Sequence, residues 1–416
     1  MMITDEARKK LFKKYEKLIA VNPDLNRRLV SFQANKQVPL YRWFKYKEGF
    51  SSKLVRYFMT KYHPTAGHIL DPFAGAGTTL FSAINPEKDL FSTDCPSWSS
   101  TGIELMPVGK FAIEARLAAE RIDRKRFHQQ MEVFGRSFDE FRDTSSRIKH
   151  IAITQNAFTG KTEENLNRYL NYFGEAISAK LRQIAGDLRG DNRNESGHDG
   201  KLTVISGSSL EALPKLADGS FDFIMTSPPY CNRYDYTRTY ALELVFLGHD
   251  DADVKRLRQE LLSCTVENKE KDHKLKEIYN KIGRRSDYDH VMSVYMACEA
   301  MQEVNSILGE LNAHKKLNNS NIPRMVRNYF LEMCFCIFEM ARILKNNGFV
   351  VMVNDNVRYG GEEIPVDLIL SSFAESFGLR LKKIWILATG KGNSSQQMGN
   401  HGKSELRKCI YVWEKI

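Results

Sequence analysis

Short apolar runs recur along the chain, and most are followed by a turn and a helical pattern. Each run is short and ends at a turn signal, which is typical of buried strands rather than of helices. We therefore expect seven strands, at residues 67–71, 102–105, 202–206, 221–226, 349–353, 379–387 and 408–413.

Between these runs the apolar positions follow a helical period. We expect helices at residues 5–20, 78–83, 108–122 and 328–344, with a mixed connector at 22–40. Alternating strands and helices predict an α/β fold with a doubly wound, parallel sheet that binds ligands at the carboxyl ends of its strands. The last two strands have no helix between them, which predicts an antiparallel strand, inserted or at an edge. The pattern alone indicates an α/β fold with two helical insertions.

Composition places the chain among ordinary globular proteins. Its 416 residues are 42% hydrophobic and 27% charged. No apolar run approaches the ~20 residues that span a bilayer, and residues 1–10 are too polar for a secretory signal. We therefore expect a cytoplasmic protein. The seven cysteines are scattered without a Cys-x-x-Cys pair, which argues against a disulfide framework and against a zinc site, so we expect no metal.

Positive charge is concentrated at the two ends of the chain. Residues 1–61 hold fifteen Lys and Arg against five Asp and Glu, and residues 380–416 hold eight against two, within a net charge of +10. The middle is therefore net acidic. Two basic ends suit a surface that meets phosphates, although a basic surface kept for solubility is the alternative.

A glycine-rich turn follows the first expected strand, with the sequence Asp-Pro-Phe-Ala-Gly-Ala-Gly-Thr-Thr at 71–79. Gly75 and Gly77 permit close approach of a ligand, and N–H groups at the start of the next helix can hold an anion. Asp71 can accept a hydrogen bond from an ammonium group. Glu104, at the end of the second strand, can accept from two ribose hydroxyls; a surface carboxylate is the alternative.

A second motif, Thr-Ser-Pro-Pro-Tyr at 226–230, forms a clamp for an amine. An exocyclic amine on a base is a poor nucleophile because its lone pair is delocalised into the ring. The Ser227 hydroxyl and the Pro228 carbonyl can accept its two hydrogens as that lone pair localises. Pro228 and Pro229 stiffen the turn, and Tyr230 offers a face on which a flipped base can stack.

Together, the two motifs resemble those of the DNA amino-methyltransferases, which make N4-methylcytosine or N6-methyladenine. The resemblance covers about half of the chain. It implies a Rossmann-like, seven-stranded methyltransferase sheet, S-adenosyl-L-methionine as cofactor and double-stranded DNA as substrate. It also implies that a cognate restriction endonuclease or another defence component is a candidate partner.

The resemblance implies further cofactor contacts. Within the glycine turn the candidates are Phe73, Ala74, Gly75, Gly77 and Thr78. Residues 43–51 resemble another cofactor-binding segment, with Phe50 and Ser51 as candidates, unless its aromatic residues only pack together. Many relatives carry an acidic residue after the third strand, where this chain has Ser208, a weaker acceptor for the adenine amine.

Two segments have the composition of nucleic-acid contacts. Residues 231–240 alternate aromatic and cationic side chains, so rings can stack and Arg233 and Arg238 can meet phosphates. Residues 390–403 are glycine-rich and polar. The candidates there for base edges and phosphate are Lys391, Asn393, Gln396 and Gln397. The alternatives are a buried stretch that supports the clamp and a plain hairpin loop.

The expected organisation has six parts. These are a basic, helical N-terminal segment (1–42), a cofactor-binding part (43–125), a helical insertion (126–200), a catalytic part (201–245), a second helical insertion (246–330) and a C-terminal part of the catalytic domain (331–416). Either insertion could recognise the target, and we favour the second because it follows the clamp directly.

The sequence therefore predicts a site-specific DNA methyltransferase. Serine at the first clamp position favours cytosine N4 as the target, with adenine N6 as the first alternative. An RNA base-amine methyltransferase and a non-catalytic DNA-binding partner on the same scaffold also remain open. Carbon-5 methylation of cytosine requires a thiolate nucleophile, usually from a Pro-Cys pair, and this chain has only Cys95-Pro96. Cys231 is expected to be a packed neighbour of the clamp.

Overall fold

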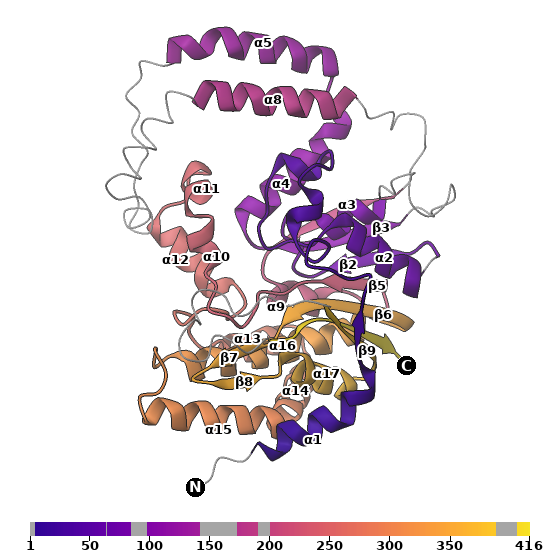
Figure 1. The fold of residues 1–416 in the computed structure, drawn as a ribbon, viewed down its shortest axis with the longest axis vertical. Helices are drawn as coiled ribbons and strands as arrows, with labels where there is room; N and C mark the ends of the chain where they lie inside the picture. Colours follow the sequence, from indigo (N-terminus) through magenta and orange to yellow (C-terminus); the bar gives the residue numbers. More distant parts are fainter. Residues whose placement is uncertain (1–4, 64, 85–97, 142–172, 190–199, 388–405) are drawn as a thin grey trace.

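A computed structural model describes residues 5–63, 65–84, 98–141, 173–189, 200–387 and 406–416. Its centre is an eight-stranded sheet with the order β1-β9-β10-β6-β5-β2-β3-β4, and β7 and β8 form a small separate hairpin (Figure 1). The strands are β1 Ile19–Asn22, β2 His68–Asp71, β3 Ser99–Glu104, β4 Leu202–Ser206, β5 Phe221–Thr226, β6 Leu344–Asp355, β7 Val357–Tyr359, β8 Glu362–Ile364, β9 Leu379–Leu387 and β10 Lys408–Lys415.

All seven expected strands are present, and the predicted α/β fold with a mostly parallel sheet is confirmed. Strands β2 to β6 pair in parallel. The last strand, β10, is inserted between β6 and β9 and runs antiparallel to both. The strand without a preceding helix is therefore inserted in the sheet. The sequence had allowed either an inserted or an edge position for it.

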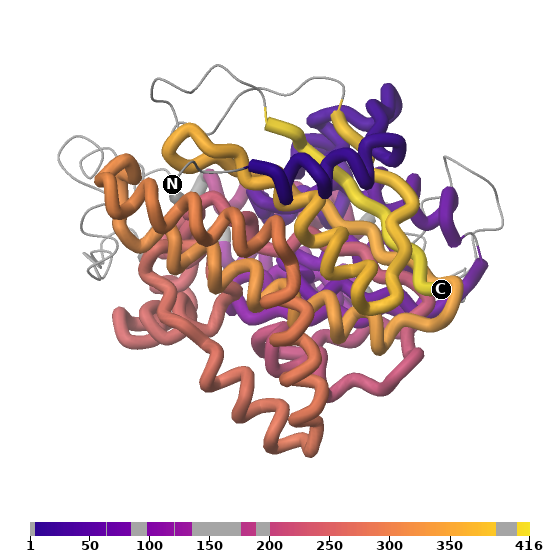
Figure 2. The backbone as a smooth tube through the Cα atoms, turned by 90° about the horizontal axis from the view of Figure 1, so that it is seen from below, coloured from indigo at the N-terminus to yellow at the C-terminus, as the bar shows by residue number. Residues whose placement is uncertain are grey.

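The N-terminal segment differs from its prediction. Helix α1 (Glu6–Tyr15) ends five residues before the expected boundary at residue 20. Strand β1 (Ile19–Asn22) occupies the position where we expected the helix to end and a connector to begin. β1 pairs in parallel with β9, with Ile19 opposite Ile384. An uncovered β9 would present unpaired backbone groups, so this segment completes the sheet as its eighth strand. Figure 2 shows α1 (indigo) running across the yellow C-terminal part.

Alternating residues of the central strands face two different hydrophobic cores. On β2, Leu70 packs into the core beneath the C-terminal helices, whereas Ile69 packs into the core on the side of α2. Ile224 and Met225 of β5 divide in the same way, as the two-residue period of a strand requires. Both faces of the central sheet are therefore buried, which explains the continuous apolar runs in the sequence.

Helices cover both faces of this sheet (Figure 1). Helices α16 and α17 contribute to the larger core and α2 to the other. The helices after α1 are α2 Ser52–Tyr62, α3 Thr78–Ile84, α4 Pro107–Ala118, α5 Arg124–Phe141, α8 Phe173–Arg189, α9 Ser209–Ala212, α10 Tyr236–Thr239, α11 Ala241–Phe246, α12 Asp251–Glu260, α13 Asp272–Lys281, α14 Arg285–Ala297, α15 Glu299–Ala313, α16 Ile322–Ile343 and α17 Val366–Ser376.

The two helical insertions are placed differently. Helices α13, α14 and α15 of the second insertion bury Tyr279, Val291 and Met301 in the larger core, beside α16. In the first insertion, α5 and α8 lie side by side and stand away from the sheet, beyond α4 (Figure 1). Asp187 of α8 accepts hydrogen bonds from Arg42 and Trp43, which anchors that helix to the N-terminal part. Within the described ranges, no helix has the length and apolarity needed to cross a membrane.

Candidate active site

A cavity lies at the carboxyl ends of β2 to β5. Its empty volume, which includes space open to solvent, is about 830 Å³. Two residues of the clamp, Ser227 and Pro229, also line it. The predicted cofactor residues along its wall are Phe50, Asp71, Phe73, Ala74, Gly75, Thr78, Glu104 and Ser208. The fold therefore brings the glycine turn and part of the clamp to one cavity.

Asp71 occupies the end of β2 and is almost fully buried. Its carboxylate accepts hydrogen bonds from Thr226 Oγ1 at 2.7 Å, Thr79 Oγ1 at 2.8 Å and the backbone N–H of Phe73 at 3.0 Å. Burial raises the pKa of Asp71 to about 6, although these three bonds oppose the shift. Two carboxylate oxygens can accept about four hydrogen bonds, so one acceptor position remains on the cavity side.

Glu104 ends the neighbouring strand β3 and lines the same cavity. Its carboxylate accepts hydrogen bonds from the backbone N–H groups of Gly75 and Met106. Burial raises the pKa of Glu104 to about 8, and the two backbone bonds counteract part of that shift. Glu104 therefore supports the glycine turn and keeps acceptor capacity toward the cavity.

The glycine turn has the conformation that its sequence predicts. Gly75 has φ +54° and Gly77 has φ +77°, in the left-handed region that favours glycine. A Cβ atom at position 75 would lie 2.8 Å from the Tyr46 ring, whose residue also lines the cavity. Two predicted cofactor residues do not line it. Gly77 donates its N–H to Ala74 within the turn, and the Ser51 hydroxyl caps α2 by accepting from Leu54.

The clamp follows β5 and begins with a buried residue. Thr226 is fully buried, and its hydroxyl is the one that bonds to Asp71. Ser227 Oγ donates to the Tyr230 hydroxyl at 3.3 Å. Pro228 is buried and does not line the cavity. Cys231 is fully buried, and burial raises its thiol pKa, so it is the packed neighbour that we expected.

A second, larger depression adjoins the first. Its empty volume is about 1,510 Å³, and it shares Glu48, Gly49 and Tyr236 with the first cavity. Tyr230 lines it together with Asn232, Tyr234, Asp355 and Asn356. Four basic residues also line it: Arg27, Lys47, Arg407 and Lys408. The clamp therefore lies between a cavity with buried carboxylates and a depression with aromatic and basic walls. Two of these basic residues, Lys408 and Arg407, are paired with Asp355 and Asp367.

Glu48 joins the two cavities, and sequence analysis missed it. Its carboxylate accepts hydrogen bonds from the hydroxyls of Tyr234 and Tyr240. The Tyr46 ring stacks on Tyr240 with centroids 5.2 Å apart and an interplanar angle of 10°. These contacts bind the segment before the glycine turn to the segment after the clamp. A lone acidic residue among cations and aromatic residues at 43–50 was the only signal available in the sequence.

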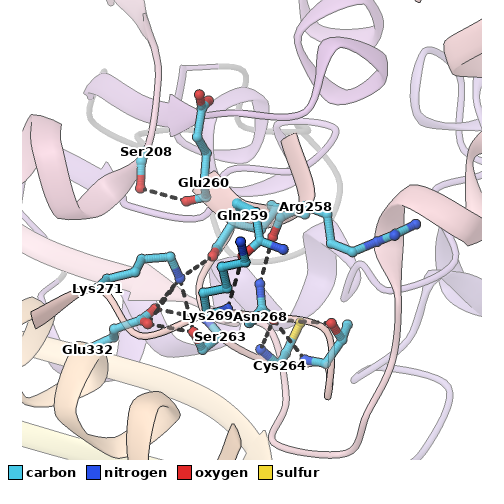
Figure 3. Close-up of polar contacts among 12 residues, drawn as sticks. Ser208, Arg258, Gln259, Glu260, Ser263, Cys264, Asn268, Lys269, Lys271 and Glu332 are labelled. Carbon is cyan, nitrogen blue, oxygen red and sulfur yellow. Dashed lines mark hydrogen bonds and ion pairs between the residues drawn. The ribbon is translucent and has the colours of Figure 1, made fainter. Parts of the chain in front are cut away.

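The segment after α12 closes another side of the first cavity, and it was also missed. Leu261 and Leu262 line the cavity beside Ser208. Ser208 Oγ donates to the main-chain carbonyl of Glu260 at 3.2 Å, as Figure 3 shows. The predicted adenine contact is therefore already tied to the second insertion.

Two of the predicted nucleic-acid residues, Arg233 and Arg238, line neither cavity. Arg233 has φ +65°, and its guanidinium donates to Asn318 Oδ1 at 2.9 Å. Arg238 is exposed on α10. The remaining candidates, Lys391, Asn393, Gln396 and Gln397, lie outside the described residues. Among the residues that the structure describes, no cluster of three or more His, Cys, Asp or Glu could hold a metal ion.

Comparison with curated proteins identifies close relatives. The chain is 38% identical to the Type II methyltransferase M.AvaI of Nostoc sp., over 98% of this chain and 93% of that protein. It is 34% identical to the Type II methyltransferase M.BsoBI of Geobacillus stearothermophilus, over 98% and 92% respectively. No family model matches the chain.

Solved structures resemble the chain only distantly. The YcgJ protein of Bacillus subtilis is 9% identical with a TM-score of 0.31, covering 87% of this chain and 97% of that one. The antibiotic-resistance methyltransferase Kmr is 8% identical with a TM-score of 0.27, covering 89% and 96%. We therefore base the fold on the strand order rather than on these superpositions.

Proposed function

Since the chain belongs to the family of Type II methyltransferases, we propose that it is a site-specific DNA methyltransferase. It transfers a methyl group from S-adenosylmethionine to the exocyclic amine of a flipped base, and the target atom that we favour is cytosine N4. One observation carries the proposal. Ser227 and Pro229 share a cavity with the carboxylates of Asp71 and Glu104, while Tyr230 lines the adjoining basic depression.

The lining residues suit S-adenosylmethionine, which would supply an electrophilic methyl group. Asp71 offers an acceptor for an ammonium group, and Glu104 offers one for ribose hydroxyls. Ile103 and Leu262 add apolar surface for a planar ring. Gly75 lets the Tyr46 ring, which lines the cavity, pack directly against the turn, because a Cβ atom there would lie 2.8 Å from that ring.

The clamp acts on the base amine. The Ser227 hydroxyl and the Pro228 carbonyl accept the two amine hydrogens, which favours a localised lone pair on nitrogen. Tyr230 holds the flipped base by stacking. As the new N–C bond forms, the sulfur–methyl bond of the donor would break and leave a thioether, while the nitrogen gives up one proton to solvent and keeps the other. No covalent enzyme intermediate is needed, because alignment of the reacting groups supplies much of the rate.

Serine at the first clamp position supports cytosine, since the resemblance associates Asn or Asp there more often with adenine N6. Hydrogen bonding alone does not distinguish the two bases, because serine, asparagine and aspartate can each accept a hydrogen bond from the amine of cytosine or of adenine. Adenine N6 is therefore the second candidate. The basic rim of the depression also suits RNA phosphates, and a cognate endonuclease remains the candidate partner.

The first insertion now supports target recognition better than the second. Helices α13 to α15 bury their apolar faces in the core, whereas α5 and α8 stand away from the sheet (Figure 1). Lys125 and Arg126 are exposed near the start of α5. We therefore propose that the helix pair of α5 and α8, rather than residues 246–330, recognises the target.

Mass spectrometry of nucleosides tests the proposed reaction. The purified chain is incubated with S-adenosylmethionine and either duplex DNA or structured RNA, and Ser227→Ala serves as the matched variant. We expect N4-methylcytosine in DNA alone, and a strong reduction in the variant. N6-methyladenine as the sole product would replace the target atom, modified RNA alone would replace the substrate, and no product with any substrate would favour a non-catalytic partner.

A further inference from the structure

Residues 261–271 connect α12 to α13. Their first part, residues 261–268, which we call the wall loop, contributes Leu261 and Leu262 to the cavity. It belongs to the second insertion, whose later helices are packed against the sheet. A side chain that lines a binding cavity helps affinity most when its position is set before the ligand arrives. The contacts that hold the wall loop therefore bear on cofactor binding.

A buried ion pair holds this loop from below. Lys271 and Glu332 are 8% and 1% exposed, and the Lys271 ammonium lies 2.9 Å from both carboxylate oxygens of Glu332. Glu332 belongs to α16, which is packed on the sheet, while Lys271 immediately precedes α13. The pair thus links the connection between α12 and α13 to α16, whose residues are mostly buried.

The same pair contacts the residues on both sides of Leu262, and Figure 3 shows Lys271 and Glu332 meeting at Ser263. The Lys271 ammonium donates to the Leu261 carbonyl at 2.8 Å and to Ser263 Oγ at 3.0 Å. Glu332 accepts from the Ser263 backbone N–H at 2.8 Å and also from its hydroxyl. The residues on both sides of Leu262 are therefore fixed by one ion pair.

Hydrogen bonds of Asn268 hold the rest of the wall loop together and join it to the end of α12 (Figure 3). Asn268 donates to the Arg258 carbonyl at 2.6 Å and accepts from the backbone N–H groups of Cys264 and Thr265. Ser208 donates to the Glu260 carbonyl at the other end. The loop is thus a preformed wall that joins the Ser208 side of the cavity to α16.

We infer that Lys271 and Glu332 are positioning residues for the cofactor, which hold Leu261 and Leu262 against its adenine end. The inference rests on the proposed function, because it assumes S-adenosylmethionine in this cavity with the adenine near Ser208. A buried ion pair is poor evidence for stability, since well-packed apolar replacements are often neutral. We therefore assign the Lys271–Glu332 pair the role of fixing the position of the wall loop.

The experiment replaces both partners in the full-length chain, as Lys271→Met with Glu332→Leu, so that no unpaired charge stays buried. The matched control is Arg284→Met with Glu339→Leu. That pair also joins the second insertion to α16, with 2.9 Å between guanidinium and carboxylate, but neither residue lines the cavity. Calorimetry measures the affinity for S-adenosylmethionine and S-adenosylhomocysteine, and thermal unfolding verifies the fold.

We expect roughly tenfold weaker binding of both ligands in the Lys271/Glu332 variant, and wild-type affinity in the control. Unchanged affinity in a folded Lys271/Glu332 variant overturns the inference alone, because a purely structural pair would change stability and not affinity. A wild-type chain that binds neither ligand overturns the proposed function, and the inference with it.

Ser263→Ala provides a milder variant if the double replacement does not fold. It removes one hydroxyl that contacts both members of the pair and leaves the charges paired. We expect roughly threefold weaker cofactor binding at a nearly unchanged unfolding temperature. Wild-type affinity in Ser263→Ala, with the unfolding temperature lowered, would assign the network to stability and contradict the inference.

Discussion

The Thr226 hydroxyl donates a 2.7 Å hydrogen bond to Oδ1 of Asp71, across 155 residues of sequence. Thr226 is the last residue of β5 and the first of the clamp motif, and Asp71 is the last residue of β2 and the first of the glycine turn. The first residues of the two motifs are therefore in direct contact. This bond aligns the strand that carries the clamp with the strand that carries the cofactor turn.

Removal of the hydrogen bond between Thr226 and Asp71 should lower the free energy of unfolding. Thr226→Val keeps the shape but leaves a buried carboxylate oxygen short of one donor, which costs about 1–3 kcal/mol in the free energy of unfolding. Urea denaturation measures the loss, and Thr203→Val, at an exposed position of β4, is the control. Equal stability of the two variants would show that Asp71 does not depend on Thr226.

Gly75→Ala should reduce cofactor binding by a steric effect. The added Cβ atom would lie 2.8 Å from the Tyr46 ring, whereas Gly219 has the same φ of +54° with nothing within 4 Å of an added Cβ. Gly219→Ala therefore carries the same backbone strain, about 1 kcal/mol, without the contact. Calorimetry with S-adenosylmethionine should show a loss for Gly75→Ala only. A similar loss in both variants would attribute it to backbone strain.

Stability should depend on pH through Glu104. Burial raises its pKa to about 8 from 4.5, so over this range the folded protein keeps a proton that the unfolded chain has lost. The free energy of unfolding should therefore be highest at low pH and fall as the pH rises through 8. Asp71 acts in the same direction but only up to its pKa of about 6. Burial lowers the pKa of His63 and of His68, which therefore act in the opposite direction near pH 6.5. Between pH 6 and pH 8 the contribution of Glu104 is isolated by comparison with a variant that cannot ionise at that position.

Thermal unfolding without ligand across that window tests the effect, with Glu104→Gln as the partner variant. Glutamine cannot ionise, so its curve should be flatter than that of the wild type between pH 6 and pH 8. Parallel curves for the two proteins would rule out Glu104 as the titrating group.

Tyr230→Ala should lose roughly 1–3 kcal/mol of base stacking. The loss should appear in turnover and in the KM for DNA, with the affinity for S-adenosylmethionine unchanged, because Tyr230 lines the second depression and not the first cavity. Tyr230→Phe keeps the ring and removes only the hydroxyl that contacts Ser227. A matching loss of cofactor affinity in Tyr230→Ala would indicate a structural role instead.

Replacement of Lys125 and Arg126 by alanine should weaken DNA binding and lower its salt dependence. Each lost phosphate contact reduces the slope of log K against log salt concentration by roughly 0.9. The control is Lys276→Ala with Lys281→Ala, exposed cations on α13 of the second insertion. A change of slope in the control and none on α5 would return target recognition to the second insertion.

Some features of this protein were determined by the sequence itself. The apolar runs predicted seven strands, because a strand buried on both faces needs a continuous apolar segment. The strings at 71–79 and 226–230 predicted the turn and the clamp, because each motif consists of residues that are adjacent in the chain. One expectation that rested on position along the chain is wrong, because β1 lies at Ile19–Asn22, where the end of a helix and a connector were expected. Target recognition stays a prediction, and we move it to the first insertion because α13 to α15 bury one face in the larger core.

Only the tertiary structure decided how the site is enclosed. Glu48 meets Tyr234 and Tyr240 across 186 and 192 residues, and Lys271 meets Glu332 across 61. Such pairs leave no local periodicity, and either residue alone resembles an ordinary charged surface side chain. β1 likewise becomes a strand only because the edge of β9 is available to it. Local patterns determine the elements and motifs, whereas contacts between distant segments form only when the whole chain has packed.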